Sequence, residues 1–240
     1  MKEDKLFSEP KEITDFNFGE ETAEVFDNML ERSIPLYREQ QRMTGEIANE
    51  FAVDGSNIYD LGCSTGITLK TLCDAVEKDV KFIGVDNSEA MLEKARDNFR
   101  KLGVSRDCRF VYGDLNEGAK IENASVVVLN LTLQFVRPLY RDLLISDIYQ
   151  GLKPNGCLIL IEKVLGNDSL FNRQFIKFYY DMKKRNGYSE MEIAQKREAL
   201  ENVLIPYRVD ENVALLKKNH FEHVDIFFKW YNFCGFIGVK

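Results

Sequence analysis

The sequence is poor in the residues and patterns that mark several common classes of protein. It has only 2 histidines, and its 5 cysteines show neither C-x-x-C nor any Cys/His ligand spacing, so no metal site is expected. No apolar segment approaches the roughly 18 residues of a membrane helix, and the first residues lack the apolar stretch of a secretory leader. We therefore expect reduced thiols and a cytoplasmic protein with no membrane partner.

Positive charge is also scarce. Lys+Arg 32 against Asp+Glu 39 gives a formal net charge of −7. A chain with this balance has no globally basic surface with which to hold a phosphate backbone, although a local basic patch remains open. Direct binding of nucleic acid is therefore not expected.

The middle of the chain, in contrast, alternates strand and helix patterns. Short apolar runs predict strands at 57–60, 81–85, 108–112, 125–130 and 156–162, with helices between them at 66–77, 88–102 and 138–151. This alternation predicts a parallel sheet with right-handed crossovers. The runs 224–230 and 233–239 are joined by too short a loop for a crossover, so we expect them to pair antiparallel.

The predicted organisation is a single domain over 1–240 with two helical additions to its core. Its parts are an N-terminal helical cap (1–54), the core (55–165), a helical lid insertion (166–210) and the terminal hairpin (211–240). In the lid, strand–helix alternation gives way to charged helical segments on either side of Asn186-Gly187. Apolar and aromatic positions in the first segment predict a homodimer, namely Phe171, Phe175, Phe178 and Tyr179.

The most informative local pattern is a glycine loop after the first predicted strand. The run from Asn57 ends in the carboxylate of Asp60, and Leu61-Gly62-Cys63-Ser64-Thr65-Gly66 follows. In open α/β sheets, ligands bind where this first strand turns into its helix. Counted from Gly62, a dinucleotide-binding loop needs its second and third glycines at the positions of Ser64 and Ile67. The binding of a pyrophosphate is therefore disfavoured. The spacing resembles motif I of the class I S-adenosylmethionine-dependent methyltransferases.

Polar residues also follow the next strands. Asp86 stands 20 residues after Gly66, the separation at which a carboxylate reaches ribose hydroxyls, although Asp86-Asn87-Ser88 also fits a helix N-cap. We expect Asp60 to face the ammonium of a methionine moiety. In the resembling families, the residue at Asp114 and its neighbour Leu115 meet the adenine, while a mere turn remains the alternative. Asn130 either lies near the transferred group or caps its strand.

The residues of conventional methyl transfer are not evident. The sequence has neither an Asn-Pro-Pro-Tyr motif nor a Cys nucleophile in a Pro-Cys context. His220 and His223 lie beside the terminal hairpin, far from the expected site, and we interpret both as surface or packing residues. The pattern therefore predicts an adenosylmethionine ligand without a catalytic group for ordinary methylation.

A second resemblance extends over nearly the whole chain. It rests on the strings at 31–37, 59–64, 84–88, 123–135, 185–190, 195–203 and 230–233. Together these strings resemble the family of carboxy-S-adenosyl-L-methionine synthases. Because they include the lid, outside the common fold, this resemblance is more specific than the glycine loop.

The family resemblance implies both a fold and a reaction. The fold is α/β and Rossmann-like, the class I methyltransferase fold, with a mostly parallel seven-stranded sheet, an antiparallel C-terminal hairpin and a helical cap and lid. The reaction converts S-adenosyl-L-methionine and prephenate to carboxy-S-adenosyl-L-methionine and phenylpyruvate. The product supplies the donor for 5-oxyacetic acid modification of wobble uridine in tRNA, which implies a functional link to the tRNA carboxymethyl-transferring enzyme. Such chemistry needs a dry pocket rather than a protein nucleophile.

The resemblance also assigns residues. Arg197 carries over as the catalytic residue that pairs with the new carboxylate, because a guanidinium matches a carboxylate bidentately. Alone, its helical segment would be interpreted as a solvated face. The implied ligand contacts are Tyr37, Asp60, Gly62, Cys63, Ser64, Asp86, Asn87, Asp114, Leu115, Asn130 and Arg197.

Two other functions remain open. One is a conventional S-adenosylmethionine-dependent methyltransferase acting on tRNA or a small molecule. The other is a non-catalytic adenosylmethionine-binding partner of the next tRNA-modifying enzyme.

Overall fold

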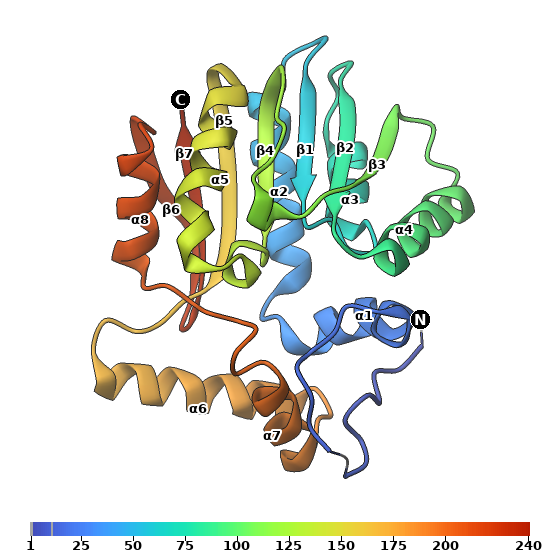
Figure 1. Cartoon of the computed structure of the whole chain (residues 1–240), viewed down its shortest axis with the longest axis vertical. Helices are drawn as coiled ribbons and strands as arrows, with labels where there is room; N and C mark the ends of the chain where they lie inside the picture. Colours follow the sequence, from blue (N-terminus) through green and yellow to red (C-terminus); the bar gives the residue numbers. More distant parts are fainter. Residues whose placement is uncertain (1, 11) are drawn as a thin grey trace.

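A single sheet in the order β3-β2-β1-β4-β5-β7-β6 organises the computed structural model, which describes residues 2–10 and 12–240 (Figure 1). Its strands are β1 (Asn57–Leu61), β2 (Lys81–Asp86), β3 (Cys108–Tyr112), β4 (Ala124–Asn130), β5 (Leu152–Lys163), β6 (His223–Trp230) and β7 (Phe233–Val239). The pairs among β1 to β5 are parallel, and β7 is antiparallel to both β5 and β6. The predicted mostly parallel sheet with an antiparallel hairpin is confirmed.

Helices cover both faces of this sheet and one of its ends. They are α1 (Glu20–Ser33), α2 (Tyr37–Phe51), α3 (Ile67–Ala75), α4 (Glu89–Leu102), α5 (Pro138–Gly151), α6 (Ser169–Arg185), α7 (Glu190–Ala199) and α8 (Val209–Lys218), with the short 3-10 helices η1 (Leu115–Glu117) and η2 (Leu133–Phe135). In Figure 1, α5 and α8 lie in front of the sheet, and α2, α3 and α4 behind it. The helices α1, α6 and α7 lie beyond the end at which the parallel strands finish (Figure 1).

Two apolar cores hold the sheet between its helical layers. Along β4, Val127 and Leu129 face one core and Val126 and Val128 face the other, and all four side chains are fully buried. The first core includes residues of α5 and α8, and the second includes residues of α2 and α3. Burial on both faces is typical of a central parallel strand. It explains why β4 is an uninterrupted apolar run.

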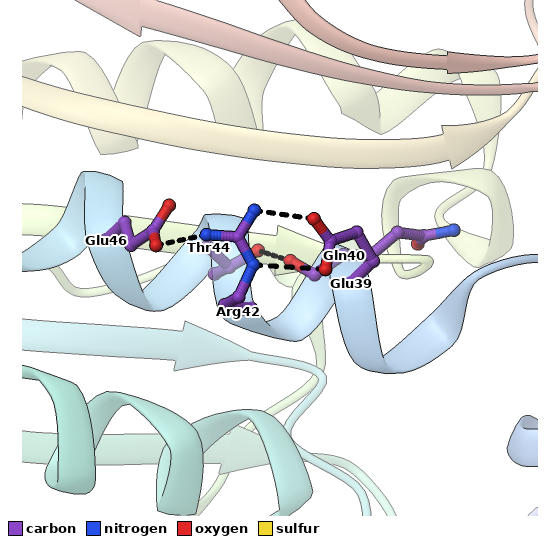
Figure 2. Close-up of polar contacts among 5 residues, drawn as sticks. All are labelled: Glu39, Gln40, Arg42, Thr44 and Glu46. Atoms are coloured by element: carbon purple, nitrogen blue, oxygen red, sulfur yellow. Dashed lines mark hydrogen bonds and ion pairs between the residues drawn. The ribbon is translucent and has the colours of Figure 1, made fainter.

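The helix α2 lies between the second core and solvent. On its exposed side, Arg42 pairs with Glu39 and Glu46, one turn away in each direction (Figure 2). On its buried side, the Thr44 hydroxyl donates to the Gln40 carbonyl at 2.8 Å (Figure 2). A buried polar group needs a hydrogen-bond partner. The hydrogen bond of Thr44 therefore lets this polar side chain pack against the sheet.

Two expectations about secondary structure need correction. The part assigned to the terminal hairpin, 211–240, begins within a helix, because residues 209–218 form α8, which is short and packs only Leu216 fully into the core. The second charged helical segment of the lid, expected to run from Ser189 to Val203, ends as α7 at Ala199, after which the chain turns. Both errors concern short helices, whose ends depend on tertiary packing rather than on periodicity.

The lid and hairpin meet in a third apolar cluster. Tyr179 and Met182 of α6 pack there with Phe228 and Phe233 of the hairpin. Tyr179, one of the aromatic positions from which the homodimer was predicted, is therefore buried within its own chain. Phe171 and Phe178 remain exposed, at 57% and 37%.

The cysteines are all free thiols. Cys157 and Cys234 are fully buried, which confirms the prediction that they are small core residues. Among the residues placed in the structure, no helix combines the length and apolar character needed to cross a membrane.

Candidate active site

A pocket opens at the carboxyl ends of β1, β2 and β4, beneath the cap and the lid. Its lining includes all of the implied ligand contacts except Asp60 and Arg197, namely Tyr37, Gly62, Cys63, Ser64, Asp86, Asn87, Asp114, Leu115 and Asn130. This edge is where the strand order reverses direction around β1, as expected for a ligand site in an open α/β sheet. Residues far apart in sequence are thus brought to one place.

The glycine loop approaches the end of β4 more closely than any side chain would allow. Gly62 and Gly66 have φ of 76° and 84°, values that favour glycine. A Cβ on Gly62 would overlap the side chain of Thr132, which follows β4. The amides of Gly62 and Cys63 both donate to the carbonyl of Val85, at 2.7 and 3.0 Å, and so fix the loop against β2.

The carboxylate of Asp86 is oriented by backbone amides. Its oxygens accept hydrogen bonds from the amides of Ser64 and Ser88, both at 2.9 Å. Burial raises the pKa of Asp86, and these donors act in the opposite direction. Ser88 caps α4 by accepting from the amide of Met91, so Asp86 lines the pocket while its neighbour performs the capping. The helix-cap interpretation of Asp86-Asn87-Ser88 is confirmed, and the contact of Asp86 with ribose hydroxyls stays a prediction.

Asp60 does not line the pocket, contrary to the expected direct contact with a ligand ammonium. It is 1% exposed and lies on the same sheet face as Ile58, which packs in the core beneath α3. Burial, together with the negative charge of Asp86, raises the pKa of Asp60 to about 7. A side chain at this register points into the helical layer rather than over the strand end.

Buried acceptor atoms without donors gather near Thr68, beside Asp60. The side-chain amides of Gln41 and Asn130 both donate to the Thr68 hydroxyl, at 3.1 and 3.0 Å. The remaining oxygens of Gln41 and Asn130 and one oxygen of Asp60 have no hydrogen-bond partner among the residues described. Buried acceptors are normally satisfied, so this cluster suits a ligand that brings N–H donors, such as an ammonium.

Asp114 serves as both turn residue and pocket residue. Its carboxylate accepts from the amide and the side chain of Asn116, at 2.9 and 2.8 Å, and so begins η1. Leu115, which follows, is buried and also lines the pocket. The two interpretations of this turn are therefore compatible.

The N-terminal cap contributes aromatic rings that were not predicted as site residues. Phe16 and Phe18 line the pocket together with Phe135 of η2, and the rings of Phe18 and Phe135 meet edge to face at 5.1 Å. The Ser88 hydroxyl donates to the Phe18 carbonyl at 2.6 Å, which ties the cap to the acidic end of β2. These rings give the pocket an apolar wall, a role that could not be inferred from single phenylalanines in a polar segment of the sequence.

On α7, Lys196 rather than Arg197 faces the pocket. Lys196 is 6% exposed and is part of the lining, whereas Arg197 is exposed and is not. Consecutive helical residues point about 100° apart, so the two side chains cannot share one direction. The implied role of Arg197 therefore cannot be performed within the pocket of its own chain in this arrangement.

Glu162 supports the loop that follows β4, a role that was not predicted. It is 2% exposed and accepts hydrogen bonds from the amides of Leu133 and Gln134, at 2.9 and 2.8 Å. Burial raises the pKa of Glu162 to about 8, against the opposing effects of Arg141 and these amides. Since Leu131, Thr132 and Gln134 line the pocket, Glu162 shapes the site from behind.

Comparison with known proteins gives the class first. Residues 58–156 match the family described as Methyltransferase domain. The structure superposes on that of an O-methyltransferase family protein from Burkholderia thailandensis with a TM-score of 0.69 at 15% identity, over 94% of this chain and 64% of that one. The predicted fold of the class I S-adenosylmethionine-dependent methyltransferases is thus confirmed.

Relatives of full length then give the family. The chain is 53% identical over 242 residues to the carboxy-S-adenosyl-L-methionine synthase of Methylococcus capsulatus, covering 100% of each chain. It is 42% identical over 240 residues to that of Desulfotalea psychrophila, covering 100% of this chain and 98% of the relative. The protein belongs to the carboxy-S-adenosyl-L-methionine synthase family and is a transferase.

Proposed function

We propose that the enzyme converts S-adenosyl-L-methionine and prephenate to carboxy-S-adenosyl-L-methionine and phenylpyruvate. The product would supply the donor for 5-oxyacetic acid modification of wobble uridine in tRNA. The observation that supports this most strongly is the similarity to carboxy-S-adenosyl-L-methionine synthases over the full length, cap and lid included. The aromatic side chains in the lining of the pocket, under that cap and lid, suit chemistry that must exclude water.

In this proposal the sheet edge binds S-adenosyl-L-methionine as a substrate. Asp86 accepts hydrogen bonds from the ribose hydroxyls, and Asp114 with Leu115 contacts the adenine. The unpaired acceptor of Asn130, which lines the pocket, receives the methionine ammonium, and Gln41 holds the Thr68 hydroxyl beside it. The buried charge of Asp60 favours a cation from behind this group.

The reaction builds a carbon–carbon bond on the sulfonium methyl group. Removal of a methyl proton leaves a sulfonium ylide, whose carbon attacks the CO2 released from prephenate. As prephenate aromatises it also loses its ring hydroxyl, which leaves with the methyl proton as water. The rings of Phe16, Phe18 and Phe135 keep bulk water from quenching the ylide.

We also propose a cytoplasmic homodimer with no direct nucleic-acid contact. Leu170 and Phe171 on α6 and Tyr231 in the hairpin turn are exposed at 53%, 57% and 43%, which favours association through this face. Because Arg197 is exposed on its own subunit, pairing with the new carboxylate requires that it reach the pocket of a second subunit. Arg197→Ala should then abolish carboxylated product while S-adenosyl-L-methionine still binds, and a monomer mass by light scattering at micromolar concentration would contradict the dimer.

Incubation of the enzyme with methyl-labelled S-adenosyl-L-methionine and prephenate tests the reaction. We expect a labelled nucleoside heavier than the substrate by one CO2, formed only when prephenate is present. S-adenosylhomocysteine as the main product would instead indicate a conventional methyltransferase. Tight ligand binding without any prephenate-dependent turnover would favour a non-catalytic binding partner.

A further inference from the structure

Three lysines converge at the end of the pocket covered by the lid. Lys163 ends β5, Lys183 lies on α6 and Lys196 on α7. Lys163 and Lys196 line the pocket, and Lys183, which is 4% exposed, lies directly behind them. We call Lys163, Lys183 and Lys196 the lysine cluster.

Two tyrosine rings connect the ammonium groups of the lysine cluster. The Nζ atoms of Lys163 and Lys183 lie 5.3 and 5.6 Å from the centroid of the Tyr179 ring. The Nζ atoms of Lys183 and Lys196 lie 5.1 and 5.8 Å from the centroid of the Tyr188 ring. Aromatic faces attract cations only weakly, so these contacts orient the ammonium groups without neutralising them.

The carboxylates near the lysine cluster form hydrogen bonds with groups other than these lysines. Over residues 2–10 and 12–240, no carboxylate lies within ion-pair distance of any Nζ in the lysine cluster. The carboxylate of Asp4, which is 2% exposed, accepts a hydrogen bond from the Tyr188 hydroxyl at 2.5 Å. Glu192 accepts from the amide of Ser189 at 2.7 Å in a helix cap.

Burying unpaired ammonium groups is unfavourable for the folded chain. Burial lowers the pKa of Lys183 to about 7, and the nearby charges of Lys196 and Lys163 lower it further. Burial also lowers the pKa of Lys196, to about 8. Ionisable groups with perturbed pKa values in a pocket or directly behind its lining are typical of a ligand site.

Charge and position both indicate the ligand. The three ammonium groups and the Arg32 guanidinium, against the carboxylates of Asp4 and Glu192, leave a charge of +2 when all are ionised, which complements a dicarboxylate. Ile161, two residues before Lys163 on β5, pairs in the sheet with Asn130 of β4. The cluster is therefore next to the strand end where the sulfonium methyl group is expected.

We propose that the lysine cluster is the subsite that binds the carboxylates of the second, dianionic substrate. This deepens the proposed function and rests on it. In this arrangement S-adenosyl-L-methionine occupies the acidic sheet edge, and the dicarboxylate lies between it and the lid. The anion neutralises the ammonium groups, so its binding stabilises α6 and α7 in their place over the pocket.

Calorimetric titration of prephenate into enzyme saturated with S-adenosylhomocysteine tests this subsite without turnover, because that nucleoside lacks the methyl group. Lys196→Gln should weaken prephenate binding tenfold or more, as expected for a lost hydrogen bond to a charged group. Lys183→Met removes a charge from behind the lining and should weaken prephenate binding by a smaller factor. Affinity for S-adenosyl-L-methionine should change less than about threefold, a difference well under 1 kcal/mol. Lys196→Arg should restore part of the prephenate affinity, because it keeps the charge.

Lys184→Met is the matched control, since Lys184 is on the same helix but is exposed and pairs with Glu190 at 2.6 Å. It should leave prephenate affinity unchanged. Unaltered prephenate affinity in both Lys183→Met and Lys196→Gln would overturn the subsite. An equal loss of affinity for both ligands together with a lower Tm would also overturn it, because it would show that the lysines stabilise the fold rather than bind prephenate.

The wild-type enzyme separates this inference from the proposed function. If it binds prephenate through the lysine cluster yet forms no carboxylated nucleoside, the proposed reaction is wrong and the subsite stands. If it forms the carboxylated nucleoside while the lysine variants bind prephenate normally, the reaction stands and the subsite is wrong. If the wild-type enzyme does not bind prephenate at all, both the proposed reaction and the subsite are wrong.

Discussion

The two ends of the pocket carry opposite charges and are held in place in different ways. At the sheet edge, Asp86 is held by two backbone amides, so its position is set by the fold itself. At the lid, the ammonium groups of Lys183 and Lys196 lie near the Tyr188 ring, and neither has a carboxylate partner within the described residues. The first end is preorganised, whereas the second holds buried ammonium groups that an anionic ligand would pair. A pocket built this way favours a cationic nucleoside at one end and an anion at the other.

The largest effect should come from removing the acid at the preorganised end. Asp86→Ala should weaken S-adenosyl-L-methionine binding roughly a hundredfold, since each hydrogen bond to a charged group contributes about 1.5–3 kcal/mol. Prephenate binding to the nucleoside-free enzyme should change little. Calorimetry with each ligand measures both effects. Asp97→Ala, which removes an exposed acid of α4 that pairs with Arg100, is the control, and equal affinities in the two variants would refute the role of Asp86.

A change at Glu162 should instead affect both ends together. Glu162→Gln replaces one acceptor by an amide that cannot accept from the backbone N–H of Leu133 or Gln134, and an unmet buried donor costs about 1–3 kcal/mol. The loop it supports lies between the two ends, so both ligands should bind more weakly and Tm should fall. Thermal unfolding and the two titrations check this. A loss confined to one ligand would show that the loop does not couple them.

The fold and the acidic end could be predicted from the sequence because they follow from local rules. Two apolar runs end in Asp60 and Asp86, with glycines between them. This local pattern predicts a ligand-binding sheet edge without information from the rest of the chain. Even there, which residue lines the pocket depends on the direction of a side chain. Asp60 proved to be buried behind the lining for that reason.

The lysine cluster could not be predicted, because it exists only in three dimensions. Lys183 stands in the run Met182-Lys183-Lys184-Arg185, and Lys196 precedes Arg197 on a charged helix, so both resemble solvated surface residues in sequence. Only the packing of α6 and α7 over β5 buries one lysine of each pair and leaves its neighbour exposed. Charge patterning along a helix does not carry this information.

The unpaired charge at the lid should also be visible in stability. The pKa of Lys183 is about 7 in the folded protein and about 10.5 in an unfolded chain. Between these values the unfolded chain binds more protons, so the free energy of unfolding should rise with pH over this window. The charged groups around Lys183 that shape this titration are Lys163, Lys196, Asp4 and Glu192.

Lys183→Met should therefore be more stable than the wild type by about 1–2 kcal/mol near pH 7, because it removes a buried unpaired charge. This advantage should shrink as the pH approaches 10. Urea unfolding at several pH values measures it. A variant less stable than the wild type at pH 7 would show that the ammonium is already well paired in the folded protein.

The smallest effect should follow a change far from both ends. Arg42→Ala on α2 removes the exposed ion pairs with Glu39 and Glu46 shown in Figure 2. Exposed pairs of this kind contribute little, so the unfolding midpoint and both affinities should match the wild type within error. A clear loss of either ligand would mean that α2 transmits its surface contacts to Tyr37 at its first turn.

The most direct test is a crystal structure of the enzyme with S-adenosylhomocysteine and prephenate bound together. The two-ended pocket predicts ribose hydroxyls within hydrogen-bond distance of Asp86 and prephenate carboxylates within ion-pair distance of Lys163 and Lys196. Prephenate placed away from the lysine cluster, with these lysines contacting the nucleoside or no ligand at all, would contradict it.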